Sequence, residues 1–124
     1  MSVGLIPENE LTRGLGADVS RVTSGPEVND HLETSVPGVF ACGNVLHVHD
    51  LVDFVSEEAA AAGKNAARYV MEGEMDRQGQ EINLKAVDGV RYTVPCTVNP
   101  QRMEDTQVVR FRVGNVYKNC YIGV

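Results

Sequence analysis

Between residues 50 and 70 the apolar positions recur every three or four residues, which is the spacing of one face of an α-helix. Acidic residues at the start and basic residues later in this stretch suit the helix dipole, and Glu57 and Glu58 fall largely on the polar face. The expected apolar face consists of Val52, Val55, Ala59, Ala62, Ala66, Tyr69 and Val70. The pattern predicts a single amphipathic helix that ends near Gly73.

The middle of this helix, residues 59–63, carries only small side chains. A glycine inside a helix, such as Gly63, costs about 1 kcal/mol relative to alanine. We therefore expect another stretch of backbone to pack closely against this part of the helix and to offset that cost.

The segment before the helix predicts a compact unit of strand, turn and loop. Residues 39–41 are typical of a short buried strand, and Gly43 and Asn44 follow as a turn where backbone can approach a ligand. A polar loop with His47 and His49 then leads into the helix. This arrangement is typical of a ligand site at a helix N-terminus.

The segments of predicted secondary structure before residue 34 are shorter. Residues 2–7 are typical of the end of a buried strand, and residues 8–15 predict one or two helical turns closed by Gly14 and Gly16. Residues 23–26 predict a turn, and residues 27–32 a short strand or extended segment.

After a polar linker the period changes to two, which indicates β-structure. Residues 82–86 and 90–94 flank Asp88-Gly89, a pair suited to a tight hairpin turn. Residues 109–113 and 116–122 flank Gly114-Asn115, a second hairpin signal. We expect a small four-stranded antiparallel unit that leans on the helix or on another chain. The predicted fold class is α+β, with a first domain at residues 1–75 and a β domain at residues 76–124.

Composition narrows the classes of function. The 124 residues are 43% hydrophobic, enough for one core, and the net charge of −6 argues against a nucleic-acid partner. No apolar run approaches the roughly 18 residues that span a bilayer. Three cysteines without a C-x-x-C pair suit a reducing compartment, so we expect a soluble, cytoplasmic protein with no membrane insertion.

Several polar residues can be interpreted either as ordinary structural or surface residues or as functional ones. His47, His49, Asp50 and Asp53 resemble a metal-ligand group, but the pattern lacks a further ligand, and a polar loop is the favoured interpretation. No metal site is therefore predicted. Cys42 is interpreted as a small buried thiol rather than a catalytic one.

The alternating pair Arg110 and Arg112 is interpreted as a solvated strand face, with a docking surface for an acidic partner as the alternative.

One stretch carries a resemblance to a known family. The run T-x-x-P-G-V-F-A-C-G-N-V at residues 34–45, followed by the alanine- and glycine-bearing helix, resembles the second FAD-binding motif of the pyridine nucleotide-disulfide oxidoreductases, which include the thioredoxin reductases. Residues 2–9 resemble the return of the chain into the FAD domain of that family. The Val-Leu-His-Val-His-Asp loop is similar to one in flavoprotein subunits associated with glycerol-3-phosphate or sarcosine-type dehydrogenases.

The resemblance implies a set of cofactor-binding residues. Gly43 stands where the family has a glycine for close packing, and Asn44 stands where it has an acid that binds the ribityl chain of FAD. The N-terminus of the following helix is aimed in the family at the flavin ring. The cofactor-binding residues implied are Gly43, Asn44, Val45, Val55, Ser56 and Glu57. Ser56 and Glu57 differ from the Arg-Gln pair of thioredoxin reductases, so a backbone role is expected there.

Other parts of the family pattern are absent from the sequence. No G-x-G-x-x-G follows a strand, and no C-x-x-C redox pair is present. We therefore expect the C-terminal fragment of an FAD-binding α/β domain followed by the small β unit, with FAD in the intact parent and none in this chain alone. The chain alone is expected to be inactive, with no catalytic residue of its own.

The resemblance implies NAD(P)H and a redox partner protein as partners of the parent. The alternative function is a non-catalytic assembly or docking module that mediates oligomerisation or binds a partner dehydrogenase subunit. In either case we expect a homo-oligomer of the fragment, because its strands lack neighbours.

Overall fold

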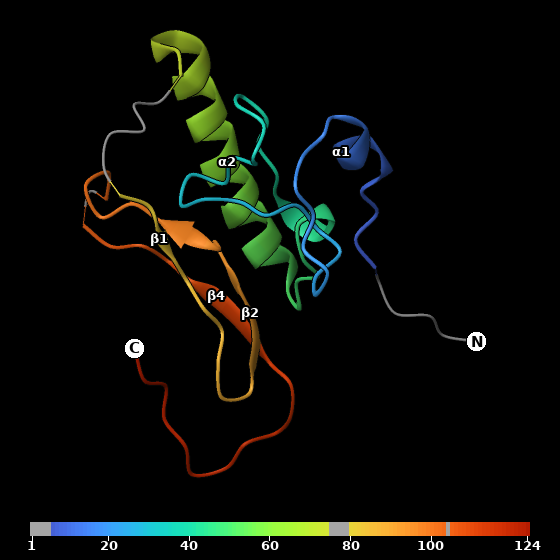
Figure 1. Cartoon of the computed structure of the whole chain (residues 1–124), viewed down its shortest axis with the longest axis vertical. Helices are drawn as coiled ribbons and strands as arrows, with labels where there is room; N and C mark the ends of the chain where they lie inside the picture. Colours follow the sequence, from blue (N-terminus) through green and yellow to red (C-terminus); the bar gives the residue numbers. More distant parts are fainter. Residues whose placement is uncertain (1–5, 75–79, 104) are drawn as a thin grey trace.

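The computed structural model describes residues 6–74, 80–103 and 105–124 of the chain. Its elements are α1 (Glu10–Gly14), η1 (Gly43–Val45), α2 (Val52–Glu72), β1 (Ile82–Asn83), β2 (Val90–Val94), β3 (Thr97–Val98) and β4 (Arg110–Val113). The long helix α2 runs beside the β-strands, and α1 lies among the loops of the N-terminal part (Figure 1). One long helix with short antiparallel strands confirms the predicted α+β fold class.

Helix α2 forms where the sequence pattern places it, and its buried face overlaps the expected one, since Val55, Ala62, Ala66 and Tyr69 are buried or half-buried, but it is rotated towards Glu58. Its two buried residues are Glu58 and Ala62. Val52 and Val70, both expected on the buried face, are 78% and 83% exposed, and Ala59 is exposed as well. The buried face is turned towards Glu58 because the loop before the helix supplies hydrogen-bond partners for this carboxylate.

The solvent side of α2 carries a continuous row of small and apolar residues, here named the α2 stripe. Its members are Val52, Ser56, Ala59, Ala60, Gly63, Ala67, Val70 and Met71, all exposed. At 100° per residue these positions cover roughly a third of the helix circumference. The expected close approach of another backbone at Gly63 is wrong for the described residues, since a Cβ there would meet nothing within 4 Å.

The loops before α2 hold only isolated bridges where strands were expected. Phe40 pairs with Glu33 in an isolated bridge, flanked by backbone hydrogen bonds from Ala41 N to Leu32 O (2.9 Å) and from Thr34 N to Val39 O (2.8 Å). Residues 27–32 form no strand, and the helical turns expected at 8–15 appear as α1. The strand expected at residues 2–7 lies mostly outside the described residues.

The β unit contains the predicted turn but not the predicted pairing. Asp88 and Gly89 have φ of 52° and 93°, as a tight turn with two positive φ angles requires. However, β1 pairs with β3 and β2 pairs with β4, both antiparallel, in two two-stranded sheets. Pro95 has no N–H to donate, and it separates β2 from β3. The second hairpin is wrong, because residues 116–122 form no strand and are exposed.

A small apolar core joins the two halves of the sequence. Val28, Ala41, Leu46 and Val94 form the buried cluster, and Leu32 and Tyr92 pack against it. The backbone N–H of Cys96 also donates to the carbonyl oxygen of Val28 at 3.0 Å. The β unit therefore packs on the loops before α2, and it contacts the helix through the side chain of Arg110. None of the helices formed by the described residues combines the length and apolar character that crossing a membrane requires.

Candidate functional site

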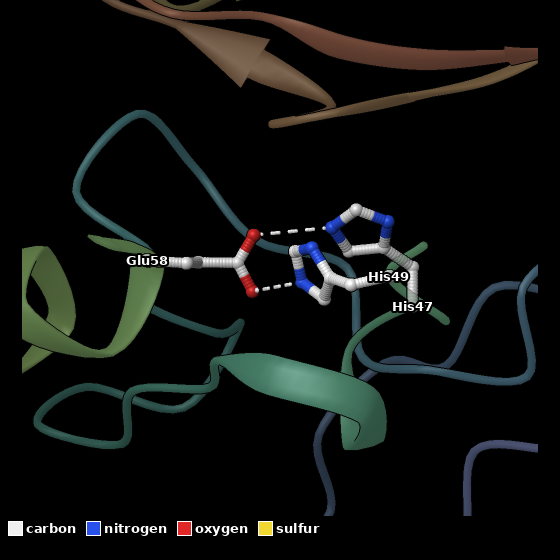
Figure 2. A group of neighbouring side chains, drawn as sticks. All are labelled: His47, His49 and Glu58. Carbon is white, nitrogen blue, oxygen red and sulfur yellow. Dashed lines mark hydrogen bonds and ion pairs between the residues drawn. The ribbon is translucent and has the colours of Figure 1, made fainter. Parts of the chain in front are cut away.

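The candidate site is centred on the carboxylate of Glu58, which projects from α2 towards the preceding loop (Figure 2). His47 Nε2 lies 3.1 Å from Glu58 Oε2, and His49 Nε2 lies 3.0 Å from Glu58 Oε1. The backbone N–H of Gly43 donates to the same Oε1 at 2.7 Å. The three side chains are 1–6% exposed, so this is a buried polar cluster, here named the His-Glu cluster.

The loop between η1 and α2 brings both imidazoles to one side. The chain turns at residues 46–47 directly after η1, and both rings then meet the same carboxylate. Their ring centroids lie 4.1 Å apart. Asn44 fixes this loop, because its Oδ1 accepts a hydrogen bond from the backbone N–H of His49 at 3.1 Å. Tyr92 of β2 contacts the His47 ring edge-on, with the centroids 5.9 Å apart.

The hydrogen bonds keep Glu58 ionised despite its burial. Burial raises the pKa of Glu58, but the hydrogen bonds from His47, the Gly43 N–H and His49 outweigh it and leave that pKa below its usual value. The nearest described guanidinium belongs to Arg110, whose Nη1 lies 4.0 Å from Oε2. The site therefore offers a fixed, negatively charged carboxylate between two imidazoles.

Two neighbouring cavities, which share Glu57, Val108 and Arg110 in their linings, reach the His-Glu cluster. A groove of about 390 Å³ is lined by both histidines and by Phe54, Tyr92, Arg110 and Arg112. A second cavity of about 420 Å³ reaches Glu58 between α2 and the β unit. Small molecules therefore have access to the histidines, although the rings themselves are largely covered.

The strand arginines are partly exposed, and they also tie β4 to the loop before α2 and to α2 itself. Arg112 Nη2 binds Asp50 Oδ1 at 3.0 Å and the Val48 carbonyl oxygen at 3.3 Å. Arg110 Nη2 contacts Glu57 Oε2 at 3.4 Å, and its guanidinium lies 5.9 Å from the centre of the Phe54 ring. These contacts close one wall of the groove.

The residues implied by the resemblance gather around η1 and the first turns of α2. Gly43 is buried with φ of 74°, which favours glycine, and its N–H is taken by Glu58. A Cβ on Gly43 would lie 3.6 Å from the side chain of Val55. Asn44 and Val45 are exposed, as are Ser56 and Glu57 on α2. Of these residues, Gly43 packs next to Val55, whereas Ser56 lies on the solvent-facing α2 stripe and Glu57 contacts Arg110.

The N-terminus of α2 is not closed by a side chain. Its N-cap residue Leu51 is extended and makes no side-chain capping hydrogen bond. The first N–H groups of a helix have no partner within the helix, so they can serve an external acceptor.

Cys42 directly precedes η1 and is a partly buried thiol, whose pKa is raised by burial and by the charge of Glu58.

Glu58 is the functional residue that the sequence pattern missed. The hydropathy period assigns it to the polar face of α2, although it lies three residues after Val55 and four before Ala62, which share its face. The metal-ligand group considered from the sequence keeps its two histidines, but its acid is Glu58 rather than Asp50 or Asp53. One ligand atom from each of His47, His49 and Glu58 can be chosen so that all lie within 4.8 Å of one another.

Comparison with protein-family models, with curated proteins and with solved structures finds no match to this chain.

Proposed function

We propose that this chain forms the ribityl and isoalloxazine side of an FAD site in a pyridine-nucleotide-linked oxidoreductase. The observation that carries the proposal is the joint geometry of η1 and α2. The glycine turn of the flavin-like motif packs on the helix that follows it, and that helix has no side-chain cap. Such a helix end favours an acceptor or an anion, and reduced flavin carries its charge on the ring edge that the family aims at this helix.

The residues present fit this role with one adjustment. Asn44 is exposed, and its Oδ1 accepts from His49, which leaves its amide N–H groups to donate to a ribityl hydroxyl. Val45 is 44% exposed beside it and would pack against the cofactor. Gly43 would contribute its backbone conformation, because its N–H is already bound to Glu58. When bound, the flavin would accept a hydride from NAD(P)H and pass electrons to a redox partner protein.

The α2 stripe supports a site that is completed by further protein. A soluble helix normally exposes polar side chains on its free face, whereas this stripe has none that is charged. The pyrophosphate of FAD needs a glycine-rich loop that this sequence lacks. We propose that the segment carrying that loop covers the stripe, so that the isolated chain binds FAD poorly.

The test is the flavin content of the whole gene product, purified under native conditions. The expected result is flavin absorption with one FAD per chain. Asn44→Asp restores the acid of the family and keeps the acceptor for His49, so it should tighten FAD binding several-fold. Asn115→Asp, at an exposed position in the C-terminal part, is the matched control. A native gene product that neither contains nor takes up FAD would refute the proposal.

The α2 stripe also favours a second candidate, an assembly or docking module that acts without flavin. In this case the stripe would be covered by a second copy of the chain. Ala60→Glu on the stripe should then convert an associating chain into a monomer in sedimentation experiments. Lys64→Glu on the charged face should leave the mass unchanged. A wild-type chain that sediments as a monomer at high concentration would rule out this candidate.

A further inference from the structure

We infer that His47, His49 and Glu58 form a binding site for one divalent transition-metal ion of the Zn²⁺ and Fe²⁺ class. The ligand atoms would be the Nε2 atoms of both histidines and an oxygen of the Glu58 carboxylate. None of these three side chains is assigned to the flavin, so the inference goes beyond the proposed function and does not depend on it.

Two of the distances in the His-Glu cluster are close to those between donor atoms around a bound ion. Donor atoms at bonds of about 2.1 Å to a tetrahedral or octahedral ion lie about 3.0–3.4 Å from one another. The two Nε2 atoms lie 3.1 and 3.0 Å from the Glu58 oxygens that they face. The two histidines face different oxygens, and one ligand atom from each of the three side chains can be chosen so that all lie within 4.8 Å of one another. Side-chain movements would therefore draw both Nε2 atoms and one carboxylate oxygen onto a single ion. Each imidazole would then keep a proton on Nδ1 and bind through its Nε2 lone pair.

The surrounding contacts already hold the ligands in place. The Gly43 N–H binds Oε1 of Glu58 at 2.7 Å and limits rotation of the carboxylate. Asn44 accepts from the backbone N–H of His49 and fixes the loop that carries both rings. Contacts of this kind orient metal ligands and commonly change metal affinity by about 10–100-fold. A site organised in this way needs little further ordering when an ion binds.

The donor set selects the class of ion. Two imidazoles and one carboxylate suit Zn²⁺ or Fe²⁺, whereas Mg²⁺ and Ca²⁺ prefer oxygen ligands throughout. Three protein ligands leave at least one position for water or another ligand, as in catalytic metal sites. Both histidines line the groove of about 390 Å³, so that position would face the groove.

Arg110 provides a distinctive electrostatic signature. Its Nη1 lies 4.0 Å from Glu58 Oε2, and a positive charge there opposes a cation in the His-Glu cluster. Replacing Arg110 by glutamine should therefore strengthen metal binding. If His47 and His49 serve only as hydrogen-bond partners of the buried Glu58 carboxylate, Arg110→Gln would not produce metal binding.

The experiment is a titration of the chelator-treated chain with Zn²⁺ by calorimetry and with Co²⁺ by visible absorption. We expect one ion per chain at micromolar affinity or tighter, without the sulfur-to-cobalt charge-transfer band that Cys42 ligation would give. His47→Ala and His49→Ala should each weaken binding at least 100-fold. The remaining histidine, His31, lies outside the cluster, so His31→Ala is the matched control and should bind as wild type.

Circular dichroism of each variant shows whether it is folded, so that weaker metal binding can be assigned to the lost ligand. Arg110→Gln should change the Zn²⁺ affinity in the opposite direction to the histidine variants, because it should bind Zn²⁺ more tightly than the wild type. Tighter Zn²⁺ binding by Arg110→Gln, together with loss in His49→Ala, would establish the site. No binding by the folded wild-type chain would overturn it. Equal affinity in the folded double variant His47→Ala/His49→Ala would also overturn it and identify an adventitious ion only.

Discussion

The backbone N–H of Gly43 donates a 2.7 Å hydrogen bond to the carboxylate of Glu58, which joins the η1 turn to helix α2 across fifteen residues of sequence. The same carboxylate faces His47 and His49, so a single helix residue holds three points of the preceding loop. One buried acid thus links the conformation of this loop to the rotation of α2 about its axis.

Replacing Glu58 by alanine should destabilise the fold strongly. The change leaves the Gly43 N–H and two imidazoles without their acceptor, and breaking a buried charged network typically costs about 3–5 kcal/mol. Urea denaturation followed by circular dichroism measures the loss. Glu57→Ala is the matched control, since Glu57 is largely exposed and its contact with Arg110 is worth about 0–1 kcal/mol. Equal losses in both variants would contradict the role assigned to Glu58.

Asp30 should make stability fall in acid. Burial raises the pKa of Asp30, but its interactions with His31 and with Arg102, whose Nη2 lies 3.0 Å from Oδ1, outweigh it and hold that pKa below 3.8. A depressed pKa in the folded state stabilises the fold above the unfolded-state value, and this contribution is lost as the pH falls through the folded-state value.

Denaturation midpoints of the wild type should therefore change little through Asp30 above pH 5 and drop below about pH 4. Asp30→Asn should be less stable at neutral pH and show a shallower drop in acid. Asp88→Asn keeps a residue that tolerates the positive φ of its turn, so it serves as the control. An acid profile of Asp30→Asn as steep as that of the wild type would exclude this role for Asp30.

Two glycine-to-alanine changes should have opposite effects. Gly25 is buried, and a Cβ there would run into the backbone carbonyl groups of Leu46 and Val45, which cannot yield as a flexible side chain would. Gly25→Ala should therefore lower the melting temperature. Gly63→Ala should raise stability by about 1 kcal/mol, because its Cβ meets open space and alanine favours the helix. The order of the three melting temperatures, with wild type in the middle, is the measurement.

The three cysteines should be alkylated at different rates. Burial raises the pKa of the Cys42 and Cys96 thiols, and nearby glutamates add to this increase, so little thiolate forms at neutral pH. Cys120 is exposed. Peptide mass spectrometry after brief treatment with iodoacetamide should find Cys120 modified first. Faster labelling of Cys42 in the folded chain would mean that it is a reactive thiol rather than a packed one.

The strongest sequence signals translate directly into structure. The helical period over residues 50–70 yields α2, and Asp88-Gly89 yields the predicted turn, because both depend on local geometry. Strand pairing could not be read in the same way. The partner of β1 lies beyond Pro95 and the partner of β2 is β4, so the pairing depends on tertiary packing rather than on the nearest turn.

The sequence indicates only part of the His-Glu cluster, because its third member also depends on tertiary packing. The spacing of His47 and His49 suggested a ligand pair, yet the third member is an acid that a hydropathy pattern assigns to water. Burial of Glu58 becomes favourable only when the loop provides the N–H of Gly43 and two imidazoles. The burial of Glu58 can therefore be inferred only from the groups that bind its carboxylate, and not from its position in the helical repeat.

The α2 stripe has a consequence for tolerance to mutation. Ala59, Ala60 and Gly63 are exposed among the described residues, so folding should accept large residues there, whereas Ala62 on the buried face should not. If a further protein segment covers the stripe, selection for activity in the whole protein would reject the same large residues. A substitution scan scored by folding and one scored by function would then agree at Ala62 and diverge along the stripe, and the positions of divergence would trace the outline of the missing contact.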